Sequence, residues 1–286
     1  MQKRRNGQLV QSDNGQDRLL KKLYGSAWGR ALLRPLVSPV VSRAAGWFLS
    51  TRLSRCLIAP FIRSNHIDMS PFPPEEYRSY NDFFARRIRP EARPIRMEED
   101  VLIAPCDSKL TVMPITSDGR FTLKHTEYTA ASLLQNAELA RHYEGGTALI
   151  FRLTVDDYHR YCYIDSGRKT GNVHIPGVLH TVNPIANDVY PIYVQNSREY
   201  TILHTRHFGD VVQMEVGALL VGRIVNHHGE AEVQRGAEKG YFQFGGSTVV
   251  VLLEKDRALL DEDVLANSAG HIETVVRMGE RIGLRC

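Results

Sequence analysis

The pattern of apolar and polar positions changes near residue 90, and the two parts of the chain predict different secondary structure. Before this point, apolar residues recur at helical spacing with lysines and arginines between them. After it, short β-branched runs are bounded by Gly, Pro, Asn and Asp, as strands and turns are. The pattern predicts an α+β protein that is mainly β, with amphipathic helices at its N-terminus.

Three helices are predicted in the N-terminal part, after a polar segment, residues 1–16, that we expect to be disordered. The first covers residues 17–33. The second begins at Ser38, a helix-capping serine followed by proline in the first turn. The third covers residues 75–88 and ends before Arg89, which precedes a proline. Residues 17–90 are therefore predicted to form one amphipathic helical region.

Residues 91–286 are predicted to form one β-rich domain. Only one clear helix, near residues 129–136, interrupts its strands. Many strands joined by short turns indicate a β-sandwich or barrel-like core and not a βαβ sheet. The predicted strands lie in residues 101–115, 147–153, 171–182, 210–225 and 241–253.

Charge is distributed unevenly along the 286 residues, and this gives the helices a second interpretation. Residues 1–55 hold eleven Lys/Arg and two Asp, a local charge of +9, while the remainder holds 25 basic and 30 acidic residues. The apolar helix faces either pack on the core or enter a lipid interface while Arg and Lys meet anionic headgroups. In the second case residues 17–90 are a membrane-associating region.

The cysteines and the hydropathy limit where the protein acts. Four cysteines lie far apart without a CxxC spacing, which argues against a zinc ribbon or a disulfide framework and favours a reducing compartment. No apolar run has the length of a membrane-spanning helix or the form of a signal peptide. We expect a protein that neither crosses a membrane nor is exported.

Several short segments combine groups that could carry chemistry. Residues 244–248 (FGGST) precede a β-branched run, which predicts a strand entered through a permissive corner with the Ser247 hydroxyl on a rigid framework. Asp107 stands at a turn beside an apolar strand, and residues 156–162 bring together carboxylates, phenols, an imidazole and a guanidinium. Each also has a structural interpretation, since a turn Asp often caps its own backbone and a single His is often structural.

Several segments occur in a characteristic order and spacing: residues 83–87 (FFARR), 92–95 (ARPI), 104–107 (APCD), 157–160 (DYHR), 180–184 (HTVNP), 196–199 (NSRE) and 239–248 (KGYFQFGGST). In this order and approximate spacing, the chain resembles the phosphatidylserine decarboxylases. The resemblance extends from about residue 75 to the C-terminus. It implies a pyruvoyl enzyme at the inner face of a membrane that converts phosphatidylserine to phosphatidylethanolamine and CO2.

Decarboxylation of an amino acid needs an electron sink, which a carbonyl provides by forming a Schiff base with the substrate amine. The resemblance implies that Ser247 attacks the carbonyl of Gly246. An N-to-O acyl shift and elimination then leave a pyruvoyl group, the covalent cofactor, at residue 247. The large and small chains produced by this cleavage are expected to remain associated.

The resemblance leaves the base for this cleavage open. Asp107 matches the acid of the family's self-cleavage triad, but Cys162 stands where many relatives have the histidine of that triad. Either His159 serves both cleavage and decarboxylation, or Cys162 acts as a thiolate, or another imidazole substitutes. We favour His159. The other imidazoles are those of His180, His227 and His228.

The remaining expectations concern substrate and partners. His180 and Arg198 are assigned to substrate binding, with Arg160 as a second candidate for the lipid phosphate, although structural ion pairs would also explain the arginines. We expect phosphatidylserine and an anionic membrane surface as partners, a possible homodimer, no nucleic acid, and a peripheral location on the cytoplasmic side of the cell membrane. No resident metal is expected.

Two competing functions remain. A metal-dependent hydrolase would use His180, His227, His228 and Glu230, although the chain has no HExxH motif. A non-catalytic lipid-surface protein of the same fold would explain Cys162.

Overall fold

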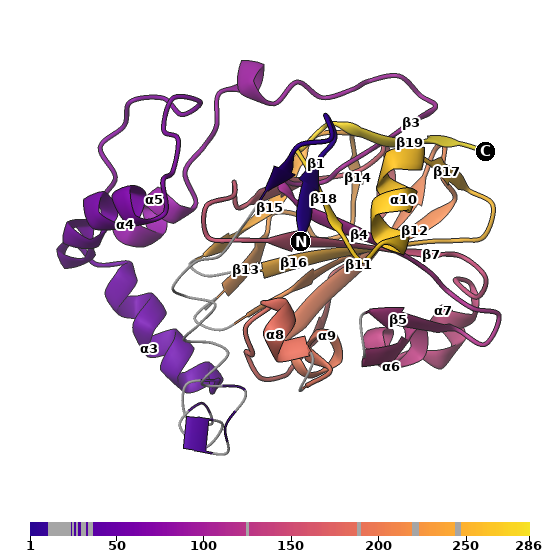
Figure 1. Cartoon of the computed structure of the whole chain (residues 1–286), viewed down its shortest axis with the longest axis horizontal. Helices are drawn as coiled ribbons and strands as arrows, with labels where there is room; N and C mark the ends of the chain where they lie inside the picture. Colours follow the sequence, from indigo (N-terminus) through magenta and orange to yellow (C-terminus); the bar gives the residue numbers. More distant parts are fainter. Residues whose placement is uncertain are drawn as a thin grey trace.

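A computed structural model of the chain describes residues 1–10, 24, 26, 28–29, 33, 37–123, 126–187, 190–218, 223–243 and 247–286. One large sheet lies at the centre, with smaller sheets and short helices around it (Figure 1). More of the described residues lie in strands than in helices, the central sheet is mixed, and the sheets do not close into a barrel. The prediction of an α+β, mainly β fold is confirmed.

The central sheet has its most buried strand in the middle. Among the described residues the strand order is β14-β9-β11-β12-β16-β7-β4-β18-β1-β2, with β10 paired to β11. Every residue of β16 is buried, and because both of its faces are covered its sequence is continuously apolar after two hydroxyl residues. The bounds are β1 Gln2–Arg4, β2 Leu9–Val10, β4 Ser108–Pro114, β7 Thr147–Leu153, β9 Gly167–Lys169, β10 Val173–Ile175, β11 Arg198–Thr205, β12 Asp210–Val216, β14 Ala231–Val233, β16 Ser247–Leu253 and β18 Glu273–Val276.

A second sheet packs on one face of the central sheet and forms the sandwich. It consists of β13 (Arg223–Asn226), β15 (Glu238–Gln243) and β8 (Arg160–Cys162). Lys239 in this sheet and Glu215 in β12 form a fully buried ion pair of 2.6 Å. The remaining strands are β3 (Val101–Ile103), β17 (Ala258–Leu260) and β19 (Arg281–Arg285) in one sheet, and β5 (Arg120–Leu123) and β6 (Thr126–Thr129) in a hairpin.

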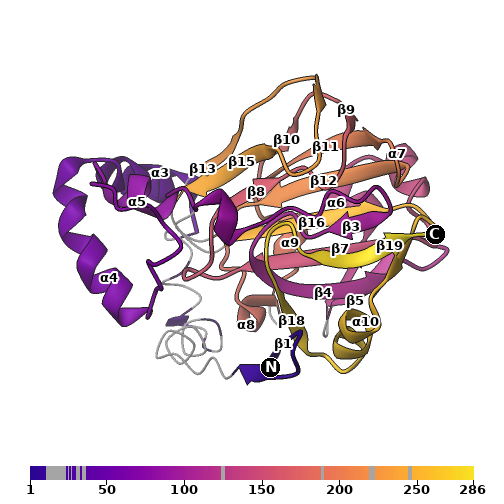
Figure 2. The same cartoon turned by 90° about the horizontal axis from the view of Figure 1, so that it is seen from above.

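The N-terminal helices project to one side of the sheets as an arm (Figures 1 and 2). As predicted, Ser38 caps the first of them, and its side chain accepts a hydrogen bond from the amide of Val40. The predicted helix over residues 75–88 is shorter, because Ser79 caps a helix that begins only at Tyr80. We call α3 (Pro39–Leu49), η1 (Arg52–Leu57) and α4 (Ile58–Ser64) the helical arm; α5 (Tyr80–Phe84) and η2 (Pro90–Ala92) follow it.

The β-rich domain contains more helices than the sequence predicted. The helix near residues 129–136 is confirmed as α6 (Ala130–Leu134), but it is not the only one in this domain. Four more, each of eight residues or fewer, are too short to give a clear periodicity. They are α7 (Ala137–Arg141), α8 (Pro184–Asn187), α9 (Ile192–Gln195) and α10 (Glu262–Ala269).

The N-terminal segment differs from its predicted disorder over residues 1–10. Strand β1 pairs in parallel with β18, and the Arg5 guanidinium binds Asp261 at 2.6 Å and Asp263 at 2.9 Å. These contacts order a polar segment that buries little apolar surface of its own. Residues 11–16 and most of the predicted helix 17–33 lie outside the described residues. No helix in the described part of the chain combines the length and apolarity needed to span a membrane.

Candidate active site

The Ser247 hydroxyl is a buried polar group without a hydrogen-bond partner among the described residues. Ser247 opens β16, is fully buried, and stands opposite Leu153 of β7. An unsatisfied buried hydroxyl costs about 1–3 kcal/mol, and a functional role is one explanation for such a group. The strand pairing fixes this hydroxyl at one end of the central sheet, because its neighbours β7 and β12 hold β16 from both sides.

The alternation of side chains along β16 places Ser247 between the two packed sheets. Gln213 of β12 stands opposite Val251, so it shares a face of the sheet with Ser247. Its amide donates to the carbonyl of Cys162 in the second sheet at 2.9 Å. Ser247 therefore faces the interior of the sandwich, whereas Thr248 faces the opposite side.

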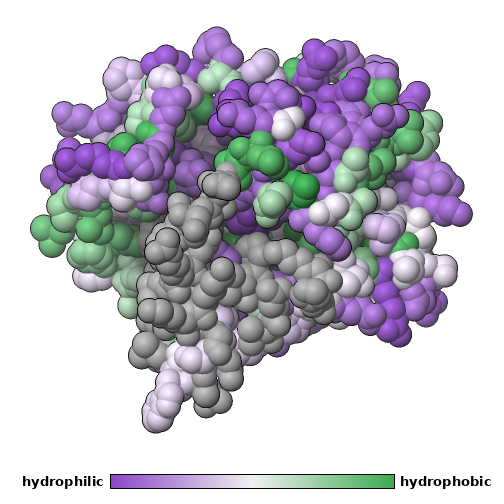
Figure 3. All heavy atoms as spheres, viewed as in Figure 1, coloured by the Kyte–Doolittle hydropathy of each residue, from purple (hydrophilic) through white to green (hydrophobic). Residues whose placement is uncertain are grey.

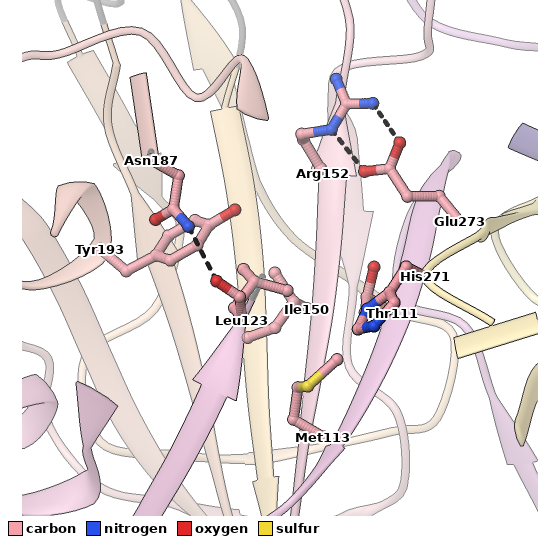
Figure 4. A pocket seen from close by; sticks show the side chains of 9 residues that line it. All are labelled: Thr111, Met113, Leu123, Ile150, Arg152, Asn187, Tyr193, His271 and Glu273. Carbon is pink, nitrogen blue, oxygen red and sulfur yellow. Dashed lines mark hydrogen bonds and ion pairs between the residues drawn. The ribbon is translucent and has the colours of Figure 1, made fainter. Parts of the chain in front are cut away.

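A pocket lies on the Thr248 face and is separate from the Ser247 hydroxyl (Figure 4). Two of its lining residues, Ile150 and Arg152, stand opposite Val250 and Thr248. Cross-strand partners share a face, so the pocket opens away from Ser247. Its charged groups are already paired, since Arg152 donates two hydrogen bonds of 2.6 and 2.7 Å to Glu273.

An ion cluster holds the end of β7 beside Ser247. Lys109 Nζ donates to both carboxylate oxygens of Asp157, at 2.6 and 2.7 Å, and to Thr154 Oγ1 at 2.5 Å. The amide of Thr154 donates to the same carboxylate at 2.6 Å. Burial raises the pKa of Asp157, and the charge of Lys109 opposes this shift. The cluster fixes the turn that leads to His159.

His159 presents a second unpartnered buried polar atom at this end of the sheet. Its Nε2 lies 3.0 Å from the Thr154 carbonyl, which can only accept, so the ring proton is on Nε2 and Nδ1 carries the lone pair. Nδ1 is buried and has no partner among the described residues. Burial, with the nearby charge of Arg86, lowers the pKa of His159 to about 3. At neutral pH the imidazole is therefore neutral.

Backbone contacts bring His159 close to Ser247. Thr154, which holds the ring, directly follows Leu153, the cross-strand partner of Ser247. The His159 carbonyl accepts a hydrogen bond of 3.0 Å from the amide of Phe242, on the strand that leads toward Ser247. Ser247 and His159 therefore lie at the same end of the central sheet, and their roles as nucleophile and base stay predictions.

Asp107 lies at the start of β4 and is held by groups other than His159. Arg93 Nε donates to its two oxygens at 2.7 and 3.0 Å, and the amide of Met278 donates at 2.9 Å. In the described part of the chain no hydrogen bond joins Asp107 to His159. The Thr154 carbonyl orients the imidazole, and the triad role of Asp107 stays a prediction.

Comparison with known proteins identifies the family. A family model described as phosphatidylserine decarboxylase matches residues 80–284. The chain is 47% identical over 274 residues to phosphatidylserine decarboxylase proenzyme 2 of Clostridium acetobutylicum, covering 96% of this chain and 93% of that protein. It is 39% identical over 272 residues to the proenzyme of Ruminiclostridium cellulolyticum, covering 93% and 91% of the two chains. The chain belongs to the phosphatidylserine decarboxylase family.

In this decarboxylase family member, Cys162 has the environment of a structural thiol. Burial raises the pKa of the Cys162 thiol to about 12, so it is protonated at neutral pH. Its amide donates to the Pro105 carbonyl at 2.8 Å, which holds the turn containing Asp107 against β8. These features argue against the thiolate base.

His180 lies at the same end of the sheet, on the β12 side. Its backbone amide and carbonyl both bind the Asn196 side chain, at 2.9 and 2.8 Å, and its ring stacks on Tyr190 at 4.5 Å. Asn196 also donates to the Gly217 carbonyl at 2.7 Å, next to the β12 residue that stands opposite Thr248. Burial lowers the pKa of His180. A substrate-binding role for His180 stays a prediction.

The two arginines predicted to meet the lipid phosphate bind groups within the fold. Arg198 is fully buried and donates to four backbone carbonyls at 2.7–3.1 Å. Arg160 donates to the Ala85 carbonyl at 2.8 Å and to Glu238 at 2.6 Å. Both arginines therefore already have partners within the protein. Phosphate binding by either arginine stays a prediction. Gly246 lies outside the described residues.

The possible ligands of the competing metal site are engaged elsewhere. His227 binds Glu238 at 2.6 Å, and His228 lies 3.1 Å from the Tyr163 hydroxyl. Glu230 pairs with Arg168. Among the described residues no group of three His, Cys, Asp or Glu side chains could hold a metal ion.

Sequence reasoning assigned no role to Lys109, Thr154 or Asp157. Asp157 belongs to residues 157–160, one of the segments that carry the family resemblance. That resemblance is the signal in the sequence that could have identified Asp157 as a site residue. The pairing of Lys109 with it depends on the register of β4 and β7, which no local pattern reveals.

Proposed function

We propose that this chain is a proenzyme that cleaves its own bond between Gly246 and Ser247 and then converts phosphatidylserine to phosphatidylethanolamine and CO2. The observation that carries the proposal is the pair of unpartnered buried atoms at one end of the sheet, Ser247 Oγ and His159 Nδ1. Family membership and the proenzyme names of the relatives support it.

The self-cleavage begins with proton transfer from the Ser247 hydroxyl to His159 Nδ1. The oxygen attacks the Gly246 carbonyl carbon, the peptide C–N bond breaks, and the proton passes to the nitrogen of residue 247. Loss of the Cα proton of residue 247 then breaks the ester C–O bond and releases the Gly246 carboxylate. Water replaces the nitrogen, which leaves as ammonia, and a pyruvoyl group remains at residue 247.

The fold would hold the two products together. Residues 247–286 contain β16, which stays paired with β7 and β12 on both sides, and also β18, which pairs with β4. A backbone cut at the entry to β16 breaks none of these pairings. The proposed enzyme is therefore one folded unit of two chains.

The surroundings of residue 247 suit decarboxylation. When present, a pyruvoyl group would supply a carbonyl that accepts electrons as CO2 leaves the substrate. The Phe84 ring packs against the His159 ring, with their centroids 4.1 Å apart, and helps to exclude water, which would otherwise stabilise the departing carboxylate. Because the His159 ring is neutral at neutral pH, Nδ1 would first take up a proton from solvent; the low pKa then makes the imidazolium a strong acid that passes this proton to the substrate carbon.

The pH dependence of self-cleavage distinguishes the two candidate bases. With a pKa of about 3, His159 is neutral throughout the range from about pH 5.5 to 8, so the cleavage rate should be flat there. A Cys162 thiolate base, with a pKa of about 12, would make the rate rise about tenfold per pH unit. The measurement is a pulse of cell-free synthesis chased at each pH and followed by denaturing electrophoresis.

We further propose that the helical arm binds an anionic membrane surface. Trp47 and Leu53 are 75% and 77% exposed, and Arg52 and Arg55 beside them are also exposed. Hydrophobic side chains gather at the left edge of the molecule, over this arm (Figure 3). Exposed aromatic and aliphatic groups with neighbouring arginines suit a lipid interface with anionic headgroups. The membrane side and a homodimer stay predictions.

Replacing both Trp47 and Leu53 by serine should weaken binding to vesicles that contain phosphatidylserine at least about tenfold. Full burial of each side chain contributes about 1.5–3 kcal/mol, and interfacial insertion recovers part of this. Cosedimentation measures the effect. Leu259→Ser is the matched control, because Leu259 is 66% exposed on β17, away from the arm. Equal binding by the double variant and the control would contradict the proposal.

A further inference from the structure

Arg86 is a buried arginine with two nitrogens that lack hydrogen-bond partners. It is 3% exposed, and its guanidinium carbon lies 4.4 Å from the Phe72 ring centroid and 4.8 Å from that of Phe83. Nε and Nη2 have no partner among the described residues, and Nη1 has only a long bond of 3.4 Å to the Phe83 carbonyl. Buried arginines are normally paired, so this arrangement leaves donors available for a ligand.

Nearby carboxylates do not neutralise this charge. Within the described ranges Arg86 forms no ion pair. Asp107 is bound to Arg93, and Glu238 is bound to Arg160. The two aromatic rings stabilise the cation but supply no negative charge. An anion that enters from outside would satisfy both the charge and the free donors.

Arg86 lies next to residues that line a surface hollow, and its charge also acts on His159. On one side, the Phe72 ring under the guanidinium also lines the hollow, and Phe83 packs against Tyr77 at 5.4 Å. On the other side, the charge of Arg86 contributes to the low pKa of His159. The hollow is lined by Met69, Ser70, Phe72, Pro73, Pro74, Glu75, Tyr77 and Arg89.

We propose that Arg86 binds the phosphate of the substrate headgroup, an inference that rests on the proposed function. The planar guanidinium matches two phosphate oxygens. The substrate carboxylate is the less suitable ligand, because an ion pair would stabilise its charge before CO2 leaves and so raise the barrier. The phosphate keeps its charge throughout. In phosphatidylserine, one CH2–O link separates the phosphate from the α-carbon. A phosphate bound by Arg86 would therefore hold the α-carbon close to His159, the residue proposed to protonate it.

The test compares the binding of three small ligands to the purified full-length protein by calorimetry. Glycerophosphoethanolamine carries the phosphate and amine, ethanolamine only the amine, and serine an amine and a carboxylate. Arg86→Gln should weaken glycerophosphoethanolamine binding by about ten- to a hundredfold, as expected for a charge-assisted contact, and leave ethanolamine and serine within about twofold. Arg87→Gln, a neighbouring exposed arginine, is the matched control and should change none of the three.

Two binding results would overturn this assignment, and a third result comes from the folding control. One is unchanged glycerophosphoethanolamine binding by Arg86→Gln, and the other is a selective loss of serine binding, which would make Arg86 a carboxylate ligand. Arg86→Met controls for folding: its melting temperature should equal or exceed that of the wild type, because an unpaired buried charge is removed. A large drop would instead indicate a structural arginine. Intact mass reports self-cleavage separately, so failure of the proposed function is distinguishable.

Discussion

Replacing Ser247 by alanine is expected to leave the protein as one chain of 286 residues, whereas the wild type should separate into two on a denaturing gel. The proposed attack on the preceding carbonyl starts from the hydroxyl of residue 247 itself, so the loss should be complete. The variant should fold normally, because Ser247 Oγ has no hydrogen-bond partner to lose among the described residues. Its melting temperature should equal or exceed that of uncleaved wild type.

Thr248→Val is the matched control for this experiment. Thr248 is the next residue and is also fully buried, but its side chain faces the opposite side of the sheet. Its removal should leave cleavage intact. If Ser247→Ala still yielded two chains, or if both variants stayed whole, the hydroxyl of Ser247 would not be the specific nucleophile.

The second large effect is expected at His159. Gln at this position keeps a side-chain N–H for the Thr154 carbonyl but has no basic nitrogen corresponding to Nδ1. Loss of a positioned general base costs about 10²–10⁴-fold in rate, so His159→Gln should accumulate as the uncleaved chain. Cys162→Ala should cleave within a fewfold of wild type, because its thiol is protonated at neutral pH.

Pulse-chase electrophoresis of both variants measures this difference, and circular dichroism shows whether each is folded. Rapid cleavage of folded His159→Gln would remove His159 as the base. Arrest of folded Cys162→Ala would restore the thiol as a candidate despite its burial. His180 would be the next imidazole to test, since it lies at the same end of the sheet.

The sequence predicted the elements that carry Ser247 better than it predicted the contacts around it. The run 147–153 corresponds to β7, and the entry into β16 falls at Ser247, because buried central strands have a continuous β-branched pattern with clear turn signals. The short helices α7 to α10 and the start of α5 were missed or displaced. Their bounds depend on caps and on tertiary packing, which outweigh a weak local periodicity.

The candidate site was predicted residue by residue but not as a set of partners. Asp107 binds Met278, which is 171 positions away in the chain, and such pairing follows from the topology alone. The carbonyl partners of Arg198 and the raised pKa of Cys162 both depend on the burial of these side chains in the fold. The local sequence does not reveal that burial. Arg86 stood in a recognised segment, but its missing partners could be seen only in three dimensions.

The intact mass of the purified, denatured wild-type protein tests the central claim most directly. Self-cleavage should give two species, residues 1–246 and residues 247–286. The smaller should be lighter by one ammonia than the same peptide beginning with serine, and blocked to Edman sequencing. A single chain of 286 residues that stays whole after incubation with phosphatidylserine vesicles would contradict the account and favour a non-catalytic lipid-surface protein.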